Sequence, residues 1–510
     1  MMVAALAAGS GAAAPTGPPP AKSEGRSQSL DLIALENRVR STLDKATPRG
    51  KINCDLARKD LAPAYRNPDF NNLSVDTRSK ALQLGIICST DIGGEETLDL
   101  ARRLDLIAPD ALARAVASYP IMAAVVGEDD KAAAQRMIVV IDGLPVLVQD
   151  WRAAWVWPMV RAVEDDETLS LALLSRLITV DWQDKTAKAS ASGWRLKLAT
   201  RHAEMKNYSA VRDTVEPLDD LETLLAVAVD RRFEPVWAEM QEAERFDWLA
   251  LIRSELALHR REMEAAPKSL SAIVLVADDL RALGRYEEAI GLLQGARARL
   301  GETGAFEDRD RYANWLLNNL AYALNEAGRP AEADVVWKEA VAEGAAQGDK
   351  ISQYVNYAGF LNRNGRSAEA VALLESADRE TASPIGKAFQ ESGLICALAR
   401  TDPVRANRMM DALLAHWEDH PPAVSGALIC MDRLDAAADI MVRRLASTKY
   451  RSEALRAAVI TLPDATDTDW DRTLAVRREA VLARPEVARA LDAAGRRLTL
   501  PIHRVYWGNE

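Results

Sequence analysis

Two histidines of this chain have the spacing of metal ligands. His416 and His420 are four residues apart, with Glu418 between them. On a helix this spacing puts both imidazoles on one face, where they could hold zinc. The order differs from the His-Glu-x-x-His of metalloproteases, no third ligand is evident, and two prolines follow at once. We therefore interpret the pair as surface residues at a helix end, and we predict neither a metal site nor a cofactor.

Alternating carboxylates form a second chemical pattern at Asp467, Asp469 and Asp471. A calcium-binding loop uses such an alternation, with a glycine at its sharp turn and a glutamate at its end. Arg472 and Arg478 stand at those two positions here. The pattern therefore predicts a polar turn whose aspartates cap a helix.

A single glutamate, Glu391, is a candidate catalytic acid, because a glycosidase acid is one glutamate held in an apolar cleft. Gln390-Glu391-Ser392 resembles the catalytic segment of lytic transglycosylases, which can join a lysozyme-like domain to an α-superhelical ring. The Gly-Leu-Met-Gln of their motif is missing, and Arg405–Leu414 continues a helical repeat. Walker, Gly-x-Ser-x-Gly, dinucleotide-binding and Cys-x-x-Cys motifs are also missing. We predict that the protein is not an enzyme, with a peptidoglycan- or glycan-cleaving superhelical enzyme as the alternative.

A repeated motif indicates the elements that must position any functional side chain. Gly-Arg-x-x-Glu-Ala occurs three times, starting at Gly284, Gly328 and Gly365. Such repetition is typical of stacked helical hairpins, each too small to bury its apolar face alone. Around the copies, alanines recur at equal intervals, at Ala277, Ala289, Ala296, Ala321, Ala333, Ala340, Ala358, Ala370 and Ala377. We expect the first alanine of each set to lie where two helices cross, since a small side chain lets the backbones approach.

The glycine of each motif should end the first helix of its hairpin. A residue in the left-handed conformation is favoured just past a helix C-terminus, and glycine adopts it at the least cost. Pro330 then fits the first turn of the next helix, because its missing N–H would have had no partner there.

The segment Leu317–Ala340 resembles a tetratricopeptide repeat (TPR), and Ile273–Ala296 and Tyr354–Ala377 resemble the same family. TPRs are helix-turn-helix units of about 34 residues that stack into a superhelix. The resemblance implies an all-α fold, a right-handed helical-hairpin solenoid, whose concave face binds a peptide or a partner protein. We therefore expect a non-enzymatic TPR-type interaction or scaffolding protein.

The repeat pattern continues more weakly on both sides of its clearest part, residues 269–377. Ser392–Cys396 and Ser425–Cys430 echo each other as members of two further hairpins. Upstream, apolar periodicity predicts helices at Trp194–Val215, Leu221–Met240 and Phe246–Ala265. The expected organisation is a leader, signal-peptide remnant or linker at 1–30, an N-terminal helical region at 31–193, the solenoid at 194–445, and a helical cap with an extended tail at 446–510.

The inner face of the first helices is the predicted binding surface. Counting turns on the side away from the crossing alanines gives polar residues with a few aromatics, which suit a hydrogen-bonding peptide groove. The predicted members are Asp278, Arg281, Trp315, Asn318, Tyr322, Asn325, Ser352, Asn362 and Arg363. Each also has a structural alternative: Trp315 would pack on a loop between repeats, and Asn318 would satisfy backbone groups between helices.

Aromatic residues outside the repeats offer a second surface. Trp151 and Trp155 share a helix face and could anchor a partner, but we favour core packing between helices. The segment Leu498–Trp507 has lost helical periodicity and contains Pro501. We expect it to be an extended tail that packs on the last helices and shields the open end of the stack.

The four cysteines divide into two pairs, Cys54 with Cys88 and Cys396 with Cys430. Equivalent positions on stacked helices lie about 8–10 Å apart between axes, whereas a disulfide needs Cα atoms within about 7 Å. We therefore expect Cys396 and Cys430, which lie in apolar runs, to be buried free thiols. Cys54 lies in a polar context, so a bond to Cys88 stays open.

Charge and the N-terminus bear on partners and location. The 510 residues carry 64 basic and 75 acidic side chains, a net charge of −11, without a long block of one sign. Nucleic-acid binding would need a clustered basic stripe, so we expect no nucleic-acid partner. Met1–Ala14 resembles the apolar core of a secretory signal peptide, although no positive charges precede it, and Pro15–Pro20 follows as a linker. We predict a periplasmic or secreted protein without a transmembrane segment, with a cytoplasmic one as the alternative.

Overall fold

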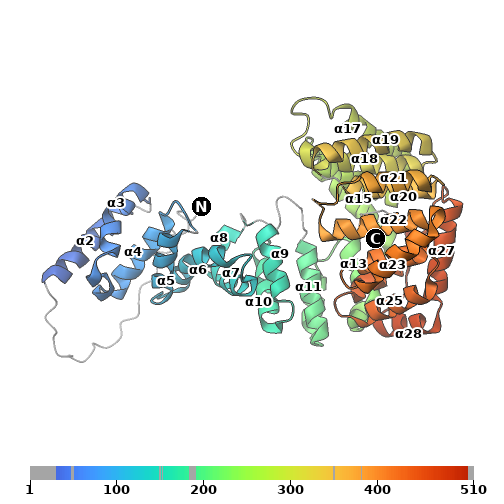
Figure 1. Cartoon of the computed structure of the whole chain (residues 1–510). Helices are drawn as coiled ribbons and strands as arrows, with labels where there is room; N and C mark the ends of the chain where they lie inside the picture. The colour runs from blue at the N-terminus through green and yellow to red at the C-terminus, as the bar shows by residue number, and fades with distance from the viewer. Residues whose placement is uncertain are drawn as a thin grey trace. The chain divides into compact units, whose positions relative to one another are not determined.

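The computed structural model describes residues 30–47, 51–92, 94–148, 151, 153–182, 191–348, 351–380 and 382–503. It divides the chain into two compact units, Met1–Pro217 and Leu218–Glu510. Helices build nearly all of both units, as the blue-to-green and green-to-red ribbons show (Figure 1). The predicted leader lies, except for its last residue, outside the described residues. None of the described helices is both long and apolar enough to cross a membrane.

The first unit is a succession of short helices in which most neighbours along the chain pack against each other. Phe70, Leu104, Met137 and Trp182 are fully buried in its core. Its helices are α2 (Leu30–Ala46), α3 (Cys54–Tyr65), η2 (Pro68–Asn72), α4 (Val75–Ile87), α5 (Glu95–Asp105), α6 (Ala111–Val125), α7 (Asp130–Gly143), α8 (Pro145–Val148), α9 (Ala153–Ala162), α10 (Glu167–Thr179), α11 (Ala191–Glu204) and α12 (Tyr208–Val215). The last two cover the segment Trp194–Val215 that we expected to open the solenoid, so this segment belongs to the first unit.

Side chains at the helix starts explain where several of these helices begin. Asp110, Asp129 and Asp166 each accept a hydrogen bond from the backbone N–H three residues later, at 2.8, 3.0 and 3.1 Å. The bond satisfies a donor that the helix itself leaves unpaired.

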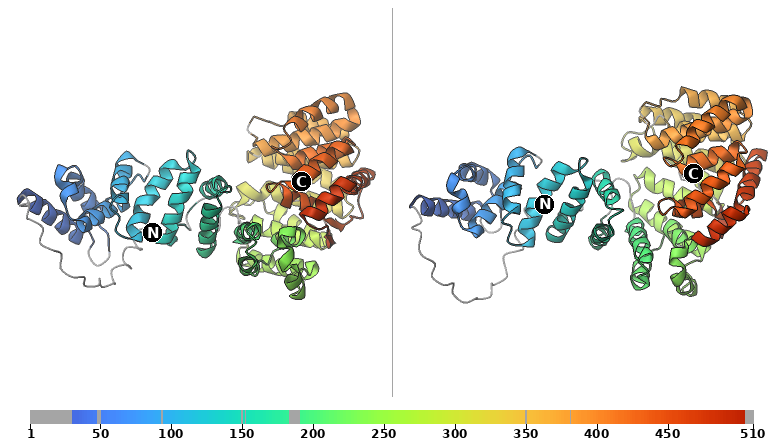
Figure 2. Two further views of the ribbon diagram at one scale, coloured as in Figure 1. Left: turned by 90° about the horizontal axis from the view of Figure 1, so that it is seen from below. Right: turned by 60° about the horizontal axis from the view of Figure 1, so that its bottom comes forward.

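The second unit is a stack of helical hairpins, shown from two further directions in Figure 2. Its leading helices are α13 (Leu221–Val229), η3 (Arg231–Phe233), α14 (Glu234–Glu242) and α15 (Trp248–Ala265). Five hairpins follow: α16 (Leu270–Ala282) with α17 (Tyr286–Ala298), α18 (Arg309–Glu326) with α19 (Pro330–Ala346), α20 (Ser352–Arg363) with α21 (Ser367–Ser376), α22 (Pro384–Thr401) with α23 (Pro403–Ala415), and α24 (Pro421–Cys430) with α25 (Leu434–Ala446). The last elements are α26 (Arg451–Ala457), β1 (Ile460–Leu462), α27 (Asp469–Leu482), α28 (Pro485–Ala494) and β2 (Thr499–His503).

Glycine ends the first helix in three of these hairpins, as predicted. Gly284, Gly328 and Gly365 have φ angles of 69°, 78° and 79°. In each turn the N–H of the following arginine bonds back to a leucine carbonyl at 2.8 Å. Asp432 takes the same place after α24, with a φ of 59°. The turn geometry therefore persists in a hairpin that has lost the glycine of the motif.

The alanine frame is confirmed as the packing frame of the hairpins. The exposed fractions of Ala277, Ala321 and Ala358 are 0%, 0% and 2%, and the other alanines of the frame are also buried. The two helices of each hairpin pack directly against each other. The second unit is thus the predicted all-α helical solenoid of TPR-like hairpins. The parallel pair of β1 and β2 is the one sheet among the described residues.

The arginine and glutamate of the motif form ion pairs at the start of each second helix. These pairs are Arg285–Glu288 at 2.6 Å, Arg329–Glu332 at 2.7 Å and Arg366–Glu369 at 2.6 Å. A second series of ion pairs joins the second helix of each hairpin to the second helix of the hairpin before it, and finally α28 to α25. These pairs are Arg329–Glu287, Arg366–Asp334, Arg405–Glu375, Arg433–Asp411 and Arg484–Asp435. Partly exposed pairs contribute only about 0–1 kcal/mol each. We therefore regard them chiefly as contacts that align successive hairpins.

The end of the second unit packs on its beginning. α26 contacts α13, α28 contacts η3, and β2 contacts both α15 and α16. The tail was expected on the last helices, and Leu498 does pack there, but residues 499–503 lie on the first helices instead. The reason is the alternation in β2: Leu500 and Ile502 are buried, and α15 and α16 supply the surface that these side chains need.

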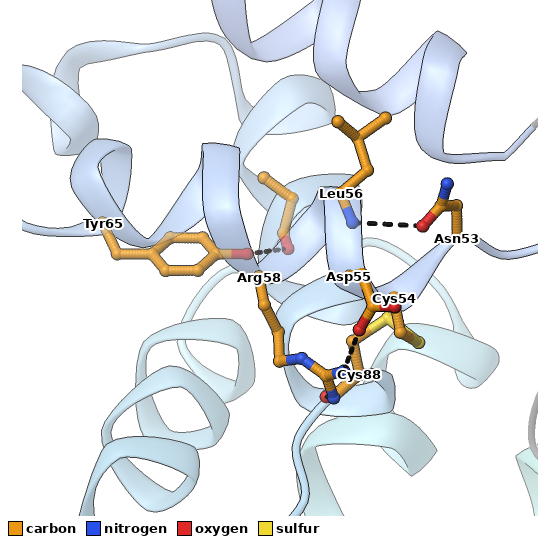
Figure 3. The surroundings of a disulfide bond; sticks show 8 residues. Asn53, Cys54, Asp55, Leu56, Arg58, Tyr65 and Cys88 are labelled. Atoms are coloured by element: carbon orange, nitrogen blue, oxygen red, sulfur yellow. Dashed lines mark hydrogen bonds and ion pairs between the residues drawn. A yellow bond between two sulfur atoms is a disulfide. The ribbon is translucent and has the colours of Figure 1, made fainter.

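All four cysteines are paired in two disulfides. Cys54 at the start of α3 bonds to Cys88 at the end of α4, with Cα atoms 5.0 Å apart (Figure 3). Arg58 lies beside this bond, where it donates to the carbonyl of Cys88 at 2.9 Å and to Asp55 at 2.5 Å. The pair whose bonding the sequence left open is thus joined.

The second disulfide overturns the prediction of free thiols at Cys396 and Cys430. Their Cα atoms, on α22 and α24, are 5.2 Å apart, which is within the reach of a disulfide. Small residues allow this approach: Ser392 on α22 donates to the carbonyl of Ala423 at 2.8 Å. The prediction was wrong because it compared the spacing of helix axes with a distance between Cα atoms: Cα atoms lie about 2.3 Å from their own axis, so two facing Cα atoms are closer together than the axes are.

Candidate functional site

The predicted residues of α16 form a buried charged cluster. Arg281 is 0% exposed and Asp278 is 3% exposed. Arg281 donates to Glu326 on α18 at 2.8 and 2.6 Å, to Asp278 at 3.0 Å, and to Asn319 at 2.8 Å. These bonds join the first helices of two successive hairpins. Because neither side chain reaches the surface, the two act as a structural link.

Burial governs the electrostatics of this cluster. Loss of solvent raises the pKa of Asp278 to about 7, against the opposing effect of Arg281. Burial alone would lower the pKa of Arg281, but Glu326 and Asp278 raise it, so the guanidinium stays charged. Removing one partner of such a buried set costs about 3–5 kcal/mol, because it leaves a charge without compensation.

Tyr322 also faces the interior. Its ring meets that of Trp337 on α19 edge to face, with centroids 4.9 Å apart, and the guanidinium of Arg281 lies 5.2 Å from its centroid. Tyr322 therefore fills the space inside its own hairpin, where an aromatic pair stabilises the core.

The predicted asparagines join consecutive first helices. Asn318 accepts a hydrogen bond from Asn356 on α20 at 2.8 Å. Asn362 accepts from Ser367 at 2.7 Å, and its carbonyl accepts from Arg400 on α22 at 2.5 Å. Both asparagines are buried, and the bond of Asn318 is to a side chain rather than to the backbone groups that the structural alternative named.

Four predicted residues keep accessible surface: Trp315, Asn325, Ser352 and Arg363 are half-buried. Arg363 lies 3.9 Å from Asp471 of α27. On α22 the exposed Ile385 and the half-buried Phe389 also keep accessible surface. Sequence reasoning missed these two residues. The signal that could have found them is an apolar side chain that lies outside the alanine frame. We call Trp315, Asn325, Ser352, Ile385 and Phe389 the open first-helix face.

The sequence patterns with possible metal chemistry fall in turns. His416 follows the last residue of α23 and His420 precedes the first residue of α24, so the two do not share one helix face. Thr468 and Asp471 form a capping box at the start of α27, which confirms the predicted capping role of this aspartate. No group of three or more metal-ligating side chains occurs within the described ranges.

Glu391 lies in the middle of α22, with its side chain 26% exposed and 3.6 Å from Arg379. Two hollows of about 340 and 320 Å³ lie at α2–α3 and at α19–α21, away from this residue. The glycan-cleaving alternative gains no support from this geometry, because a glycosidase acid needs a cleft for the sugar.

The tryptophans of the first unit pack in its core. Trp151 stacks on Tyr119 with centroids 6.4 Å apart, and Trp157 lies 4.4 Å from Trp194. Trp155 is half-buried. Core packing is thus the role of Trp151 and Trp157.

Comparison with known proteins adds the following. No protein-family model matches the chain, and no curated protein sequence matches it either. Among solved structures, the chain is similar to the crystal structure of the P58(IPK) TPR domain, with 16% sequence identity and a TM-score of 0.17. The match covers 78% of this chain and 98% of that one. Whole-chain superposition at that score is poor, so the TPR-like character is defined by the repeated hairpins themselves.

Proposed function

We propose that this protein binds a partner protein or peptide and acts as an interaction or scaffolding protein. The stack of five hairpins carries this proposal. Its first helices are joined by buried polar links. Stacked repeats of this kind generally form extended binding surfaces.

The open first-helix face is the proposed contact surface. Trp315 and Phe389 are half-buried, which leaves part of each ring accessible while the rest is held by the stack. Rigid aromatic side chains lose little entropy on binding and are common anchors of interfaces. Ile385 is 57% exposed and adds apolar area. We infer a partner segment with apolar side chains that cover these three residues.

A double variant tests this face. Trp315→Ala with Phe389→Ala should reduce capture of the native partner at least tenfold, since two anchors together contribute more than about 1.4 kcal/mol. The measurement is quantitative mass spectrometry of proteins captured by the purified full chain. Val335→Ala on α19, a residue 53% exposed on a second helix, is the matched control. Equal capture by all three proteins would refute the proposed face.

We further propose that the protein is exported to the periplasm or secreted. The support is the pairing of all four cysteines, since disulfides persist in oxidising compartments and are rare in the cytosol. The apolar run Met1–Ala14, outside the described residues, fits the same location. Mass spectrometry of the native protein should find a cleaved N-terminus and four cysteines protected from alkylation. An intact Met1 with free thiols would contradict export.

A further inference from the structure

A segment near the end of the chain crosses the hairpins at the ends of their first helices. We call the turns after α16, α18, α20, α22 and α24 the turn edge. Side chains between Asp464 and Arg477 contact residues of all five turns or of the helix ends beside them. Figure 1 shows α27, the red helix in this segment, beside the orange helices of the later hairpins.

Asp464 and Thr466 contact the first two turns. The Oδ1 atom of Asp464 accepts a hydrogen bond from the hydroxyl of Tyr286 at 2.9 Å, and it lies 3.0 Å from Nδ1 of His503. Thr466 lies against Gly328, where a Cβ added to the glycine would be 3.7 Å from the Thr466 methyl group. The first contacts are therefore made by one carboxylate and one methyl group.

Trp470 and Asp471 contact the ends of the next two first helices, α20 and α22. The Oδ1 atom of Asp471 is 3.9 Å from Nε of Arg363, at the end of α20. The ring centroid of Trp470 lies near two guanidinium groups, 4.9 Å from that of Arg400 at the end of α22 and 5.6 Å from that of Arg477. An arginine over a tryptophan ring contributes about 0.5–2 kcal/mol, depending on its exposure.

Arg477 completes the series at α24. It donates to the carbonyls of Ile429 and Cys430 at 3.0 and 2.7 Å, and it pairs with Asp432 at 3.1 Å. The last carbonyls of a helix have no partner within the helix, so the arginine satisfies two of them.

The contacts resemble those of a bound peptide more than those of a core. Thr466, Asp467 and Trp470 are half-buried. Each turn is contacted by one or two side chains, through a methyl group at Gly328 and through polar or cation–π contacts at the others. The flanking parts are different, since Leu482 and Leu500 are buried. The crossing segment is thus held at both ends by apolar packing and along its length by charges.

We propose that the turn edge is a binding track for a segment in which acidic residues and a tryptophan lead into a helix, and that residues 464–477, which include the start of α27, are its resident ligand. A partner segment of the same chemistry replaces the resident one on Tyr286, Arg363 and Arg400. This use of the track by a partner rests on the proposed interaction function, whereas the resident contact does not.

A peptide of residues 463–478 tests the track with the full chain. In the wild-type protein the tethered segment competes at an effective concentration of about millimolar, so added peptide should bind weakly. A triple variant, Asp464→Asn, Trp470→Ala and Asp471→Asn, should bind the labelled peptide at least tenfold more tightly. Asp469→Asn is the matched control, because that side chain is 100% exposed and pairs with Arg472 in its own helix.

Fluorescence anisotropy gives the affinities, and circular dichroism melting establishes that each variant is folded. A peptide carrying the same three substitutions should not bind any of the proteins. Equal binding of the native peptide to all folded proteins, or binding of the substituted peptide, would overturn the proposal. If the triple variant does not fold, Trp470→Ala alone is used with the same criteria. Peptide binding without any captured partner would refute the proposed function and leave the track standing. A captured partner without peptide binding would refute the track and leave the proposed function standing.

Discussion

At the scale of single residues, burial raises the pKa of two carboxyl groups, on α15 and α16, to near neutrality. Glu255 on α15 accepts a hydrogen bond from the backbone N–H of Leu221. Burial, together with the nearby Asp279 and Asp220, raises its pKa to about 7 despite that bond. The same cause acts on Asp278. Stability should therefore depend on pH in a range where surface carboxyls are already ionised.

Glu255→Gln should weaken this pH dependence. A carboxyl whose pKa is raised by folding does not destabilise the protein below its unfolded pKa, near 4.5. As the pH rises from there to about 7, the free energy of unfolding falls, because the unfolded state releases the proton more readily than the folded state does. The free energy of unfolding of the wild type should thus fall over that window, with about 1–3 kcal/mol due to Glu255. Denaturant unfolding at pH 4.5 to 8 measures it. The exposed Glu264→Gln should retain the wild-type slope, and an unchanged slope in Glu255→Gln would contradict the assignment.

A second residue-scale prediction concerns left-handed positions without glycine. Lys206, between α11 and α12, has a φ of 58° and an exposed side chain. A side chain in this conformation costs about 1–2 kcal/mol, which glycine avoids, although glycine gains entropy in the unfolded chain. We expect Lys206→Gly to raise the stability of the first unit by about 0.5–1 kcal/mol, and Gly365→Ala to lower that of the second. Thermal melting of both variants measures this, and a lower melting temperature for Lys206→Gly would contradict the argument.

At the scale of elements, the two disulfides each join two helices of one unit, and they lie in different units. Cys54–Cys88 joins α3 to α4, and Cys396–Cys430 joins α22 to α24. Serine at both positions of the second pair should destabilise the second unit by about 2–4 kcal/mol, because the unfolded chain gains freedom. Calorimetry should show two unfolding transitions, since the units are separately compact. Serine at Cys396 and Cys430 should shift one transition, and serine at Cys54 and Cys88 should shift the other. A shift of the same single transition by both changes would contradict that independence.

The elements also show how far the sequence leads. The turns at Gly284, Gly328 and Gly365 and the alanine crossings were predictable, because backbone conformation and side-chain size act locally and repeat. The partner of a side chain was not: Tyr322 has the spacing of an inner-face residue, yet it packs on Trp337 of its own hairpin. Nor did the spacing of helix axes give the distance between the Cα atoms of Cys396 and Cys430, which face each other between α22 and α24. Four of the candidate-site residues on α16 and α18, Asp278, Arg281, Asn318 and Tyr322, are buried in this structure, because periodicity gives a helix face but not what covers it.

At the scale of the second unit as a whole, its end is bonded to its beginning. Asp230 and Gly495 form an antiparallel backbone bridge, and the N–H of Arg496 donates to the carbonyl of Val229 at 2.9 Å. The guanidinium of Arg496 lies 3.9 Å from the ring centroid of Trp237. These residues are more than 250 positions apart along the chain, so no periodic pattern could have indicated the contact.

Gly495→Ala tests this closure directly. A Cβ at this position would lie 1.9 Å from the carbonyl oxygen of Val229 and 2.9 Å from a methyl group of Leu455. Because one of these neighbours is backbone, the bridge itself must separate, which we expect to destabilise the second unit by about 1–3 kcal/mol. Hydrogen exchange should rise in α13 and α28 first, since they flank the bridge. Gly359→Ala is the control: its added methyl meets no atom within 4 Å, and alanine favours the helix. Unchanged exchange in α13 and α28 of a Gly495→Ala protein would mean that the two ends hold together without this bridge, and the closure would then rest on the packing of β2 against α15 and α16.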